Sequence, residues 1–431
     1  MSAAVSRLVP PAGVQRTLAA AQLASAVGDG AYYTCSALYF THIVGMSATS
    51  LGIGLAIAWA LGSIAGVPLG ALADRRGPRG TAVVLALATA VVVTTFLVIR
   101  SYPPFLIAVC LYATTQSGLT AARQALVAGL VSRAERTGLL AHLQSTLNGG
   151  LAVGAAIGGI ALTVGTRAAF LGAFTVTALG FVAGALLLLR LPQVPPVVEQ
   201  SGSGPRLAVL RDRRYAVVAL VNTVLLLRMP LLSLIIPLWI ADRAPGLGWL
   251  GSALFVLNTV GVMAFQVQAA RDVTGLPSAA RAVRSAGLLL LLSCVVFGLS
   301  ALDVPAWGLA ALLVAASVLQ LVGEMRQSAG SWQIGFDLAP PDRIGQYQGF
   351  FGTGVAVART VGPLLLTTLL LDGGLLGWLV LGGLFLAAGH AMGPAVRWAE
   401  RDRGYQSAPE SSSAADPSSP SVVGATAAEA P

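Results

Sequence analysis

The sequence contains no lysine, and all 26 of its basic residues are arginines. The phosphate-binding loop of ATPases needs a glycine-rich turn with a lysine, so we do not expect ATP hydrolysis by this chain. Cysteine is also rare: Cys35, Cys110 and Cys294 lie in separate apolar runs, which argues against a disulfide framework or a thiolate metal site. The three histidines have no metal-ligand spacing. We therefore expect no metal, no other cofactor and no enzymatic activity.

Charged side chains make up only 10% of the 431 residues, while 56% are hydrophobic and the mean hydropathy is +0.80. A soluble protein of this length could not bury so much apolar surface, so the composition predicts an all-α integral membrane protein with the lipid bilayer as its surroundings. The net charge of +9 indicates arginines gathered on one membrane face and not a nucleic-acid partner.

Apolar runs of about 20 residues, long enough to cross a hydrocarbon core of about 30 Å, occur twelve times. The predicted spans are 18–42, 50–70, 80–99, 104–131, 140–164, 168–190, 215–240, 248–268, 282–302, 306–336, 346–371 and 375–397. The organisation that follows is an N-terminal segment at 1–17, six helices at 18–190, a linker at 191–214, six helices at 215–398 and a disordered tail at 399–431.

The arginines are unevenly divided between the two faces that these spans define. Nineteen fall on the side of the termini, three (Arg100, Arg167 and Arg243) fall on the other side, and four lie within spans. Because segments rich in arginine stay in the cytoplasm, both termini are predicted to be cytoplasmic, with the chain in the cell membrane.

A short charged turn at 70–79 separates the second span from the third. Its glycine, leucine, aspartate, arginine and glycine at positions 70, 72, 74, 75 and 77 resemble the loop between the second and third helices of the major facilitator superfamily. Pro78 stands where that loop usually has a basic residue. The resemblance implies twelve helices in two pseudo-symmetric bundles, with a substrate site between them. The residues that it implies for a cytoplasmic gate are Gly70, Asp74, Arg75, Gly77 and Arg79.

Four charged residues lie within spans at matching places in the two halves of the chain. Asp29 and Arg228 are 199 residues apart, and Arg123 and Glu324 are 201 apart. Burying a charge in lipid is costly, so each is a functional candidate. In the superfamily, the corresponding first, fourth, seventh and tenth helices line the central cavity. We expect Asp29 and Glu324 to bind protons or a cationic substrate, and Arg123 and Arg228 to tune these carboxylates or to bind an anionic group. Static ion pairs that hold the helices together are the alternative.

Polar side chains accompany these charges at helical spacing, which indicates stripes that face protein or water and not lipid. The predicted substrate-cavity residues are Gln22, Tyr32, Tyr33, Ser36, Gln116, Thr120 and Gln320. Two further arginines within spans, Arg326 and Arg359, receive no assigned role.

Glycines recur at every fourth position of the fifth span, a pattern that lets helices approach closely. The predicted packing residues are Gly150, Gly154, Gly158 and Gly159. Their spacing resembles the antiporter motif of the superfamily's twelve-helix drug:proton efflux branch, with Ala155 in place of its proline.

Together these features predict a monomeric secondary transporter that exports small amphipathic compounds in exchange for protons, by alternating access. Two alternatives stay open. One is uptake or facilitated diffusion of a metabolite, and the other is a non-transporting membrane receptor or interaction protein.

Overall fold

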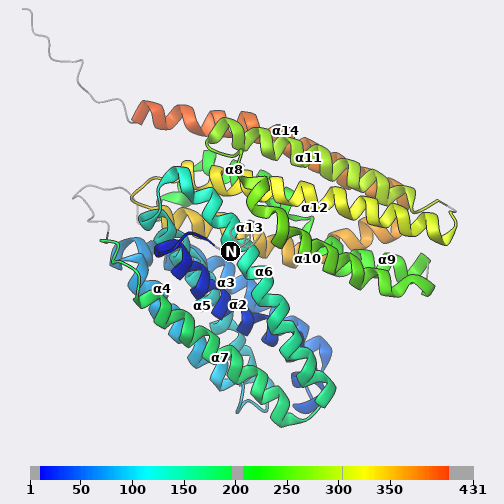
Figure 1. Cartoon of the computed structure of the whole chain (residues 1–431), viewed down its shortest axis with the longest axis horizontal. Coiled ribbons are helices and arrows are strands. Elements are labelled where there is room, and N and C mark those ends of the chain that lie inside the picture. The colour runs from blue at the N-terminus through cyan, green and yellow to red at the C-terminus, as the bar shows by residue number, and fades with distance from the viewer. Residues whose placement is uncertain (1–9, 197–206, 244, 303, 407–431) are drawn as a thin grey trace, which may run out of the picture.

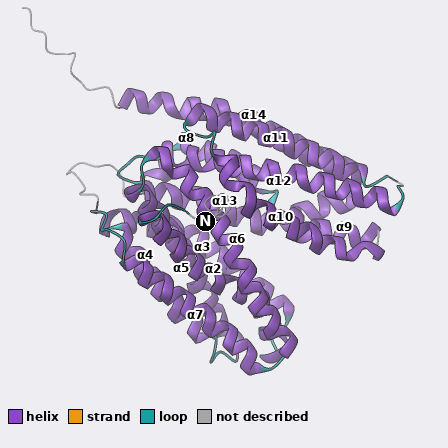
Figure 2. Ribbon diagram, viewed as in Figure 1, coloured by secondary structure: helices purple, strands orange, loops and turns teal. Residues whose placement is uncertain are grey.

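The computed structural model describes residues 10–196, 207–243, 245–302 and 304–406, and in these residues the regular elements are helices without any strand (Figure 2). The first helices are α2 (Val14–Leu38), α3 (Ala48–Arg76), α4 (Pro78–Thr95), α5 (Tyr102–Leu130), α6 (Arg133–Val164) and α7 (Arg167–Leu189). They are followed by α8 (Arg213–Leu226), α9 (Ile236–Arg243), α10 (Gly248–Ala270), α11 (Leu276–Leu299), α12 (Ala306–Asp337), α13 (Ile344–Leu366) and α14 (Gly374–Gln406).

Short π-helical and 3₁₀ turns extend or join these helices. They are η1 (Tyr39–Ile43), η2 (Ala208–Arg211), η3 (Leu231–Ile235), η4 (Pro245–Leu247) and η5 (Thr367–Asp372). The predicted linker and tail lie partly outside the described residues, at 197–206 and 407–431.

Eleven of the helices in the described residues are long and apolar enough to cross a membrane. One of them is the combined segment Arg213–Arg243, in which η3 joins α8 to α9. Helix α2 has 25 residues but is not among the eleven, because Gln22, Asp29 and its tyrosines lower its hydropathy. The prediction of an all-helical membrane protein is confirmed for the described residues.

The turn between α3 and α4 is built from glycine and proline. Gly77 has a φ of 94°, a conformation that side chains with a Cβ rarely adopt. Pro78 follows as the first residue of α4, where its fixed φ suits a helix start and its missing N–H costs nothing. Pro78, which stands where the superfamily loop usually has a basic residue, thus starts α4 directly after the turn at Gly77.

The helices form an N-terminal group, α2–α7, and a C-terminal group, α8–α14, which Figure 1 shows as the lower and upper halves of the molecule. In the first group α2 packs along α6 and α7 while α3 packs along α5, and in the second α11 packs along α12 and α14. Between the groups, α3 packs on α13 and α6 on α10. The groups come together at the left of Figure 1 and separate toward the right, where α9 lies.

Backbone-to-backbone contacts join the two groups where α3 ends and α13 begins. A Cβ on Gly70 would overlap the carbonyl of Gly345, and one on Gly349 would overlap the carbonyl of Gly66. Glycine is needed because any side chain would push the helices apart. We call this end of the molecule, which also carries the turn at Gly77, the Asp74 end.

Candidate functional site

Asp29 lies on α2 between two glycines that bring this helix against its neighbours. A Cβ on Gly28 would come within 2.9 Å of the α7 backbone at Thr177, and a Cβ on Gly30 would overlap the α6 carbonyl of Leu151. With two sides of α2 held this way, the carboxylate of Asp29 reaches α5. Its Oδ1 accepts hydrogen bonds of 2.8 Å from both Tyr112 Oη and Gln116 Nε2.

Arg123 lies two turns further along α5 and binds neutral oxygen atoms on α2. Its Nη1 donates to Gln22 Oε1 at 3.1 Å and its Nη2 to Ser25 Oγ at 2.7 Å. Its Nε is buried and has no hydrogen-bond partner in the described residues. Neither Arg123 nor Asp29 makes an ion pair within the described part of the chain, so each is held in place by uncharged groups.

Arg228 and Glu324 form an ion pair in the C-terminal group, with 2.9 Å between Nη1 and Oε1. The side chains are 6% and 21% exposed, respectively. Arg228 lies between the end of α8 and Pro230, where the helix is interrupted by the π-helical turn η3. The Nε and Nη2 atoms of Arg228 also donate to Gln327 Oε1, at 3.2 and 2.9 Å. Gln327 in turn donates to Asn222 Oδ1 at 2.8 Å, which completes a buried network.

The four predicted intramembrane charges therefore do not behave alike. In the described residues the pair Arg228–Glu324 is in direct contact, while Asp29 and Arg123 have neutral partners. Four side chains of the networks described above were not among the predicted site residues: Ser25, Tyr112, Asn222 and Gln327. Gln327 was detectable, since it follows Glu324 by three positions on one helix face.

The predicted cavity residues differ in their exposure. Tyr33 is 44% exposed, whereas Tyr32 is 3% exposed and its ring centroid lies 4.9 Å from that of Tyr112 and 5.5 Å from that of Phe96. Tyr32 thus belongs to an aromatic cluster inside the N-terminal group. The other cavity candidates range from exposed through partly exposed to buried: Thr120, then Gln22, Ser36 and Gln116, then Gln320.

The two unassigned arginines lie at different places. The Arg359 guanidinium on α13 lies over the ring of Trp59 on α3, 5.8 Å from its centroid, and so links the two groups. Arg326 on α12 donates from Nε to Ser285 Oγ on α11 at 2.8 Å. It lines a pocket at the Asp74 end of the C-terminal group.

Three of the four predicted packing glycines face α2. A Cβ on Gly150 would come within 2.6 Å of Ala26 Cβ, and one on Gly158 within 2.8 Å of Thr34 Cβ. A Cβ on Gly154 would overlap the carbonyl of Val27. Gly159 has open space where its Cβ would be, so it does not take part in this contact.

Asp74 joins the two groups by capping a helix of the opposite group. Its Oδ1 accepts from the backbone N–H of Gly345 at 2.7 Å and its Oδ2 from that of Gln346 at 2.9 Å. These N–H groups belong to the first turn of α13, where donors have no carbonyl partner within the helix and the helix dipole favours a negative charge. Beside this contact Arg75 is exposed and Gly77 is buried.

We expect the Asp74→Ala variant to weaken the contact between the groups by about 1 kcal/mol, a roughly fivefold shift in the equilibrium, because it removes a helix cap. Nitroxide labels at Gly80 and Pro341, both exposed at the Asp74 end, would report a longer mean distance. Asp272→Ala is the matched control, since Asp272 occupies the related turn before α11 and makes no hydrogen bond within the described residues. Equal label distances in all three proteins would contradict this role.

A family model described as Major Facilitator Superfamily matches residues 18–363 of the chain. The chain belongs to the major facilitator superfamily. This superfamily member has no match among curated protein sequences. Its fold is that of solved transporters that share little sequence with it, so the likeness establishes the fold alone.

Three of these solved structures are informative. The human organic anion transporter MFSD10 (TETRAN) is 17% identical, with a TM-score of 0.63 over 88% of this chain and 98% of that one. The E. coli fucose:proton symporter FucP is 14% identical, with a TM-score of 0.68 over 89% and 98%. A bacterial homologue of the iron transporter ferroportin, solved in an outward-facing state, is 14% identical, with a TM-score of 0.68 over 90% and 100%. Membrane transport is the activity that this family and these folds support.

Proposed function

We propose that this superfamily member is a proton-coupled exporter of small amphipathic compounds, with Asp29 as its proton site. The observation that carries the proposal is the setting of Asp29: a carboxylate within a helix bundle, without an ion pair in the described residues, bound by Tyr112 and Gln116. A charge within the membrane-spanning part of the chain is costly, so an ionisable residue there is a candidate for a functional role. Both partners contain an oxygen that can accept a hydrogen bond, so the same pocket can hold the neutral acid as well as the carboxylate.

The transport cycle that we propose is alternating access between two six-helix bundles. The bundles are α2–α7 and α8–α14, with α2 as the twelfth span and with domain limits at 18–190 and 215–398. We place the Asp74 end in the cytoplasm, with both termini, because most of the arginines lie on that side. The contacts between Gly70 and Gly345 would then close the cytoplasmic side, and the molecule would be open to the outside of the cell membrane. Similarity to a ferroportin homologue in an outward-facing state supports this assignment.

Protonation of Asp29 can be coupled to this cycle through Arg123. The Asp29 carboxylate on α2 binds Gln116 of α5. Two turns further along α5, the Arg123 guanidinium binds Gln22 and Ser25 of α2. Neutralising Asp29 removes a negative charge from the same pair of helices that holds Arg123. The arginine is then free to take an anionic partner, or to rearrange, when the bundles move.

Several side chains of the two bundles that are exposed or partly exposed suit an amphipathic substrate. Tyr33 and Trp59 offer aromatic surface, while Gln116, Thr120 and Arg359 offer polar groups. Aromatic rings with a few polar groups are typical of sites for small organic molecules.

Proton-coupled uptake is the second candidate. It is favoured by Ala155, which replaces the antiporter motif's proline and lies in an uninterrupted helix, α6. Similarity to a fucose:proton symporter points the same way.

The experiment that tests the proposal measures internal pH in proteoliposomes while candidate compounds are added across an imposed pH gradient. Export by antiport requires protons to move opposite to the substrate, and uptake by symport requires them to move together. Substrate movement without any proton movement would refute proton coupling and leave facilitated diffusion. A failure to move any compound in a broad panel would favour the receptor alternative.

A further inference from the structure

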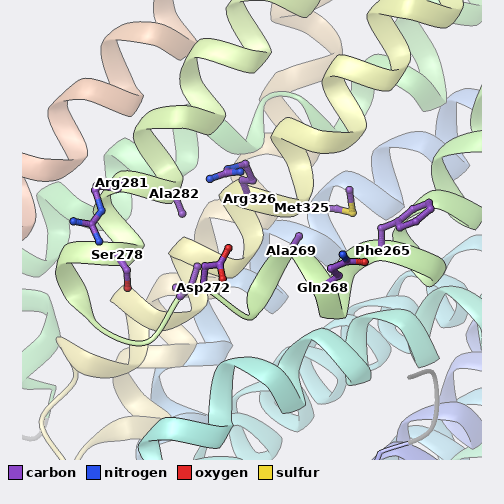
Figure 3. A pocket seen from close by; sticks show the side chains of 10 residues that line it. Phe265, Gln268, Ala269, Asp272, Ser278, Arg281, Ala282, Met325 and Arg326 are labelled. Carbon is purple, nitrogen blue, oxygen red and sulfur yellow. The ribbon is translucent and has the colours of Figure 1, made fainter. Parts of the chain in front are cut away.

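A pocket of about 480 Å³ opens at the Asp74 end of the C-terminal group, and none of its lining residues belongs to the charged networks described above (Figure 3). Helices α10, α11 and α12 and the turn between α10 and α11 supply its lining. Arg281 and Ser278 lie at one end, Met325 and Phe265 lie at the other, and Arg326 and Asp272 lie between them (Figure 3). The pocket is therefore basic at one end and apolar at the other.

The two arginines are available for an anion. Arg326 is fixed by the 2.8 Å bond from its Nε to Ser285 Oγ, which leaves both terminal nitrogens without a partner in the described residues. Arg281 is exposed and makes no hydrogen bond or ion pair to any described residue. Asp272 lines the same pocket but lies beyond ion-pair distance of both arginines among the described contacts. The lining thus carries one net positive charge.

The basic end continues into an apolar surface along α11. Arg281, Ser285, Leu288 and Leu292 follow one another at intervals of four, three and four residues and so share one face of the helix. Leu288 and Leu292 are 47% and 42% exposed, and Phe265 on α10 is 55% exposed. Exposed apolar side chains beside Arg281, near the start of α11, and Arg326, on α12, match the interface between lipid headgroups and acyl chains.

We propose that this pocket binds the headgroup of an anionic phospholipid from the leaflet at the Asp74 end. The single negative charge of its phosphodiester matches the net charge of the lining, and the two guanidinium groups supply the donors that a phosphate prefers. Asp272 can accept a hydrogen bond from a headgroup hydroxyl, as in phosphatidylglycerol. The acyl chains continue along Leu288 and Leu292. This inference does not depend on which compound the protein transports.

The test is native mass spectrometry of the full chain released from nanodiscs that contain phosphatidylglycerol, phosphatidylethanolamine or phosphatidylcholine. We expect the wild type to retain phosphatidylglycerol in preference to the other two lipids. The Arg281→Gln/Arg326→Gln variant should bind it about tenfold more weakly. The matched control is Arg397→Gln/Arg401→Gln, which removes the same charge from exposed positions on α14 and should bind as the wild type does.

Several outcomes would overturn the proposal. These are equal retention by the pocket variant and the wild type, an equal loss in the control variant, and retention of phosphatidylethanolamine as strong as that of phosphatidylglycerol. A competition arm separates lipid from free phosphate: dihexanoyl-phosphatidylglycerol should displace the bound lipid, and inorganic phosphate at the same concentration should not. Displacement by inorganic phosphate would assign the pocket to a soluble anion instead. A thermal unfolding curve for each variant shows that the folded protein is being compared.

Discussion

The Asp29→Asn variant is expected to exchange labelled substrate across a liposome membrane at close to the wild-type rate, while its proton-driven accumulation falls to the level of protein-free liposomes. Asparagine has nearly the same shape as aspartate, and its amide oxygen can still accept the hydrogen bonds from Tyr112 and Gln116. Asparagine cannot bind and release a proton. Substrate exchange should therefore be retained, while the coupling of transport to the proton gradient should be lost. Substrate counterflow and accumulation driven by a pH gradient measure the two activities separately.

Asp372→Asn is the control for this experiment. Asp372 ends η5, is exposed, and lies at the far end of the segment that begins with α13. The substitution makes the same chemical change at a place without a role in the site, so both activities should be retained. Proton-driven accumulation in Asp29→Asn at the wild-type level would show that the proton binds elsewhere.

Glu324→Leu is expected to lower the stability of the folded protein by about 3 kcal/mol, because it leaves a buried charge without its partner. Arg228 is 5% exposed and has its only ion pair among the described residues with Glu324. The Arg228→Met/Glu324→Leu variant removes both charges and should recover most of the loss, since apolar replacement of a buried ion pair is often nearly neutral. Unfolding titrations in mixed micelles measure the difference between the three proteins.

The double variant also separates the two interpretations of this ion pair. Proton-driven transport at the wild-type level in a stable double variant would mean that the pair only holds the helices together. Loss of transport with stability restored would mean that the pair takes part in the cycle. A single variant as stable as the wild type would contradict the stabilising role.

The apolar runs predict the helices well but misplace some of their ends. The last predicted span stops at 397, whereas α14 continues to Gln406. Hydropathy falls where the charged residues begin, but the helix continues past that point. The seventh span is interrupted directly after Pro230, since proline removes an N–H donor from the helix. The first span has a low mean hydropathy because it carries Gln22 and Asp29, the polar residues that make it a candidate site.

The sequence identifies the charged members of the site more readily than their partners. Asp29 and Arg228 stand out because ionisable residues are rare in apolar runs. Tyr112 does not, because a tyrosine in such a run resembles any aromatic core residue. Asp74 was detectable from its turn, but its partners are backbone N–H groups of α13, and nothing in a sequence shows which distant helix will begin beside it.

The glycine contact between α2 and α6 bears on how motion is transmitted within the molecule. At Gly30 and Gly154 the two helices meet backbone to backbone, and a backbone has no rotamers that could absorb a small displacement. We therefore expect the two helices to move together as one rigid unit. A shift of α6 against α10, at the boundary between the groups, should then move the segment of α2 that carries Asp29.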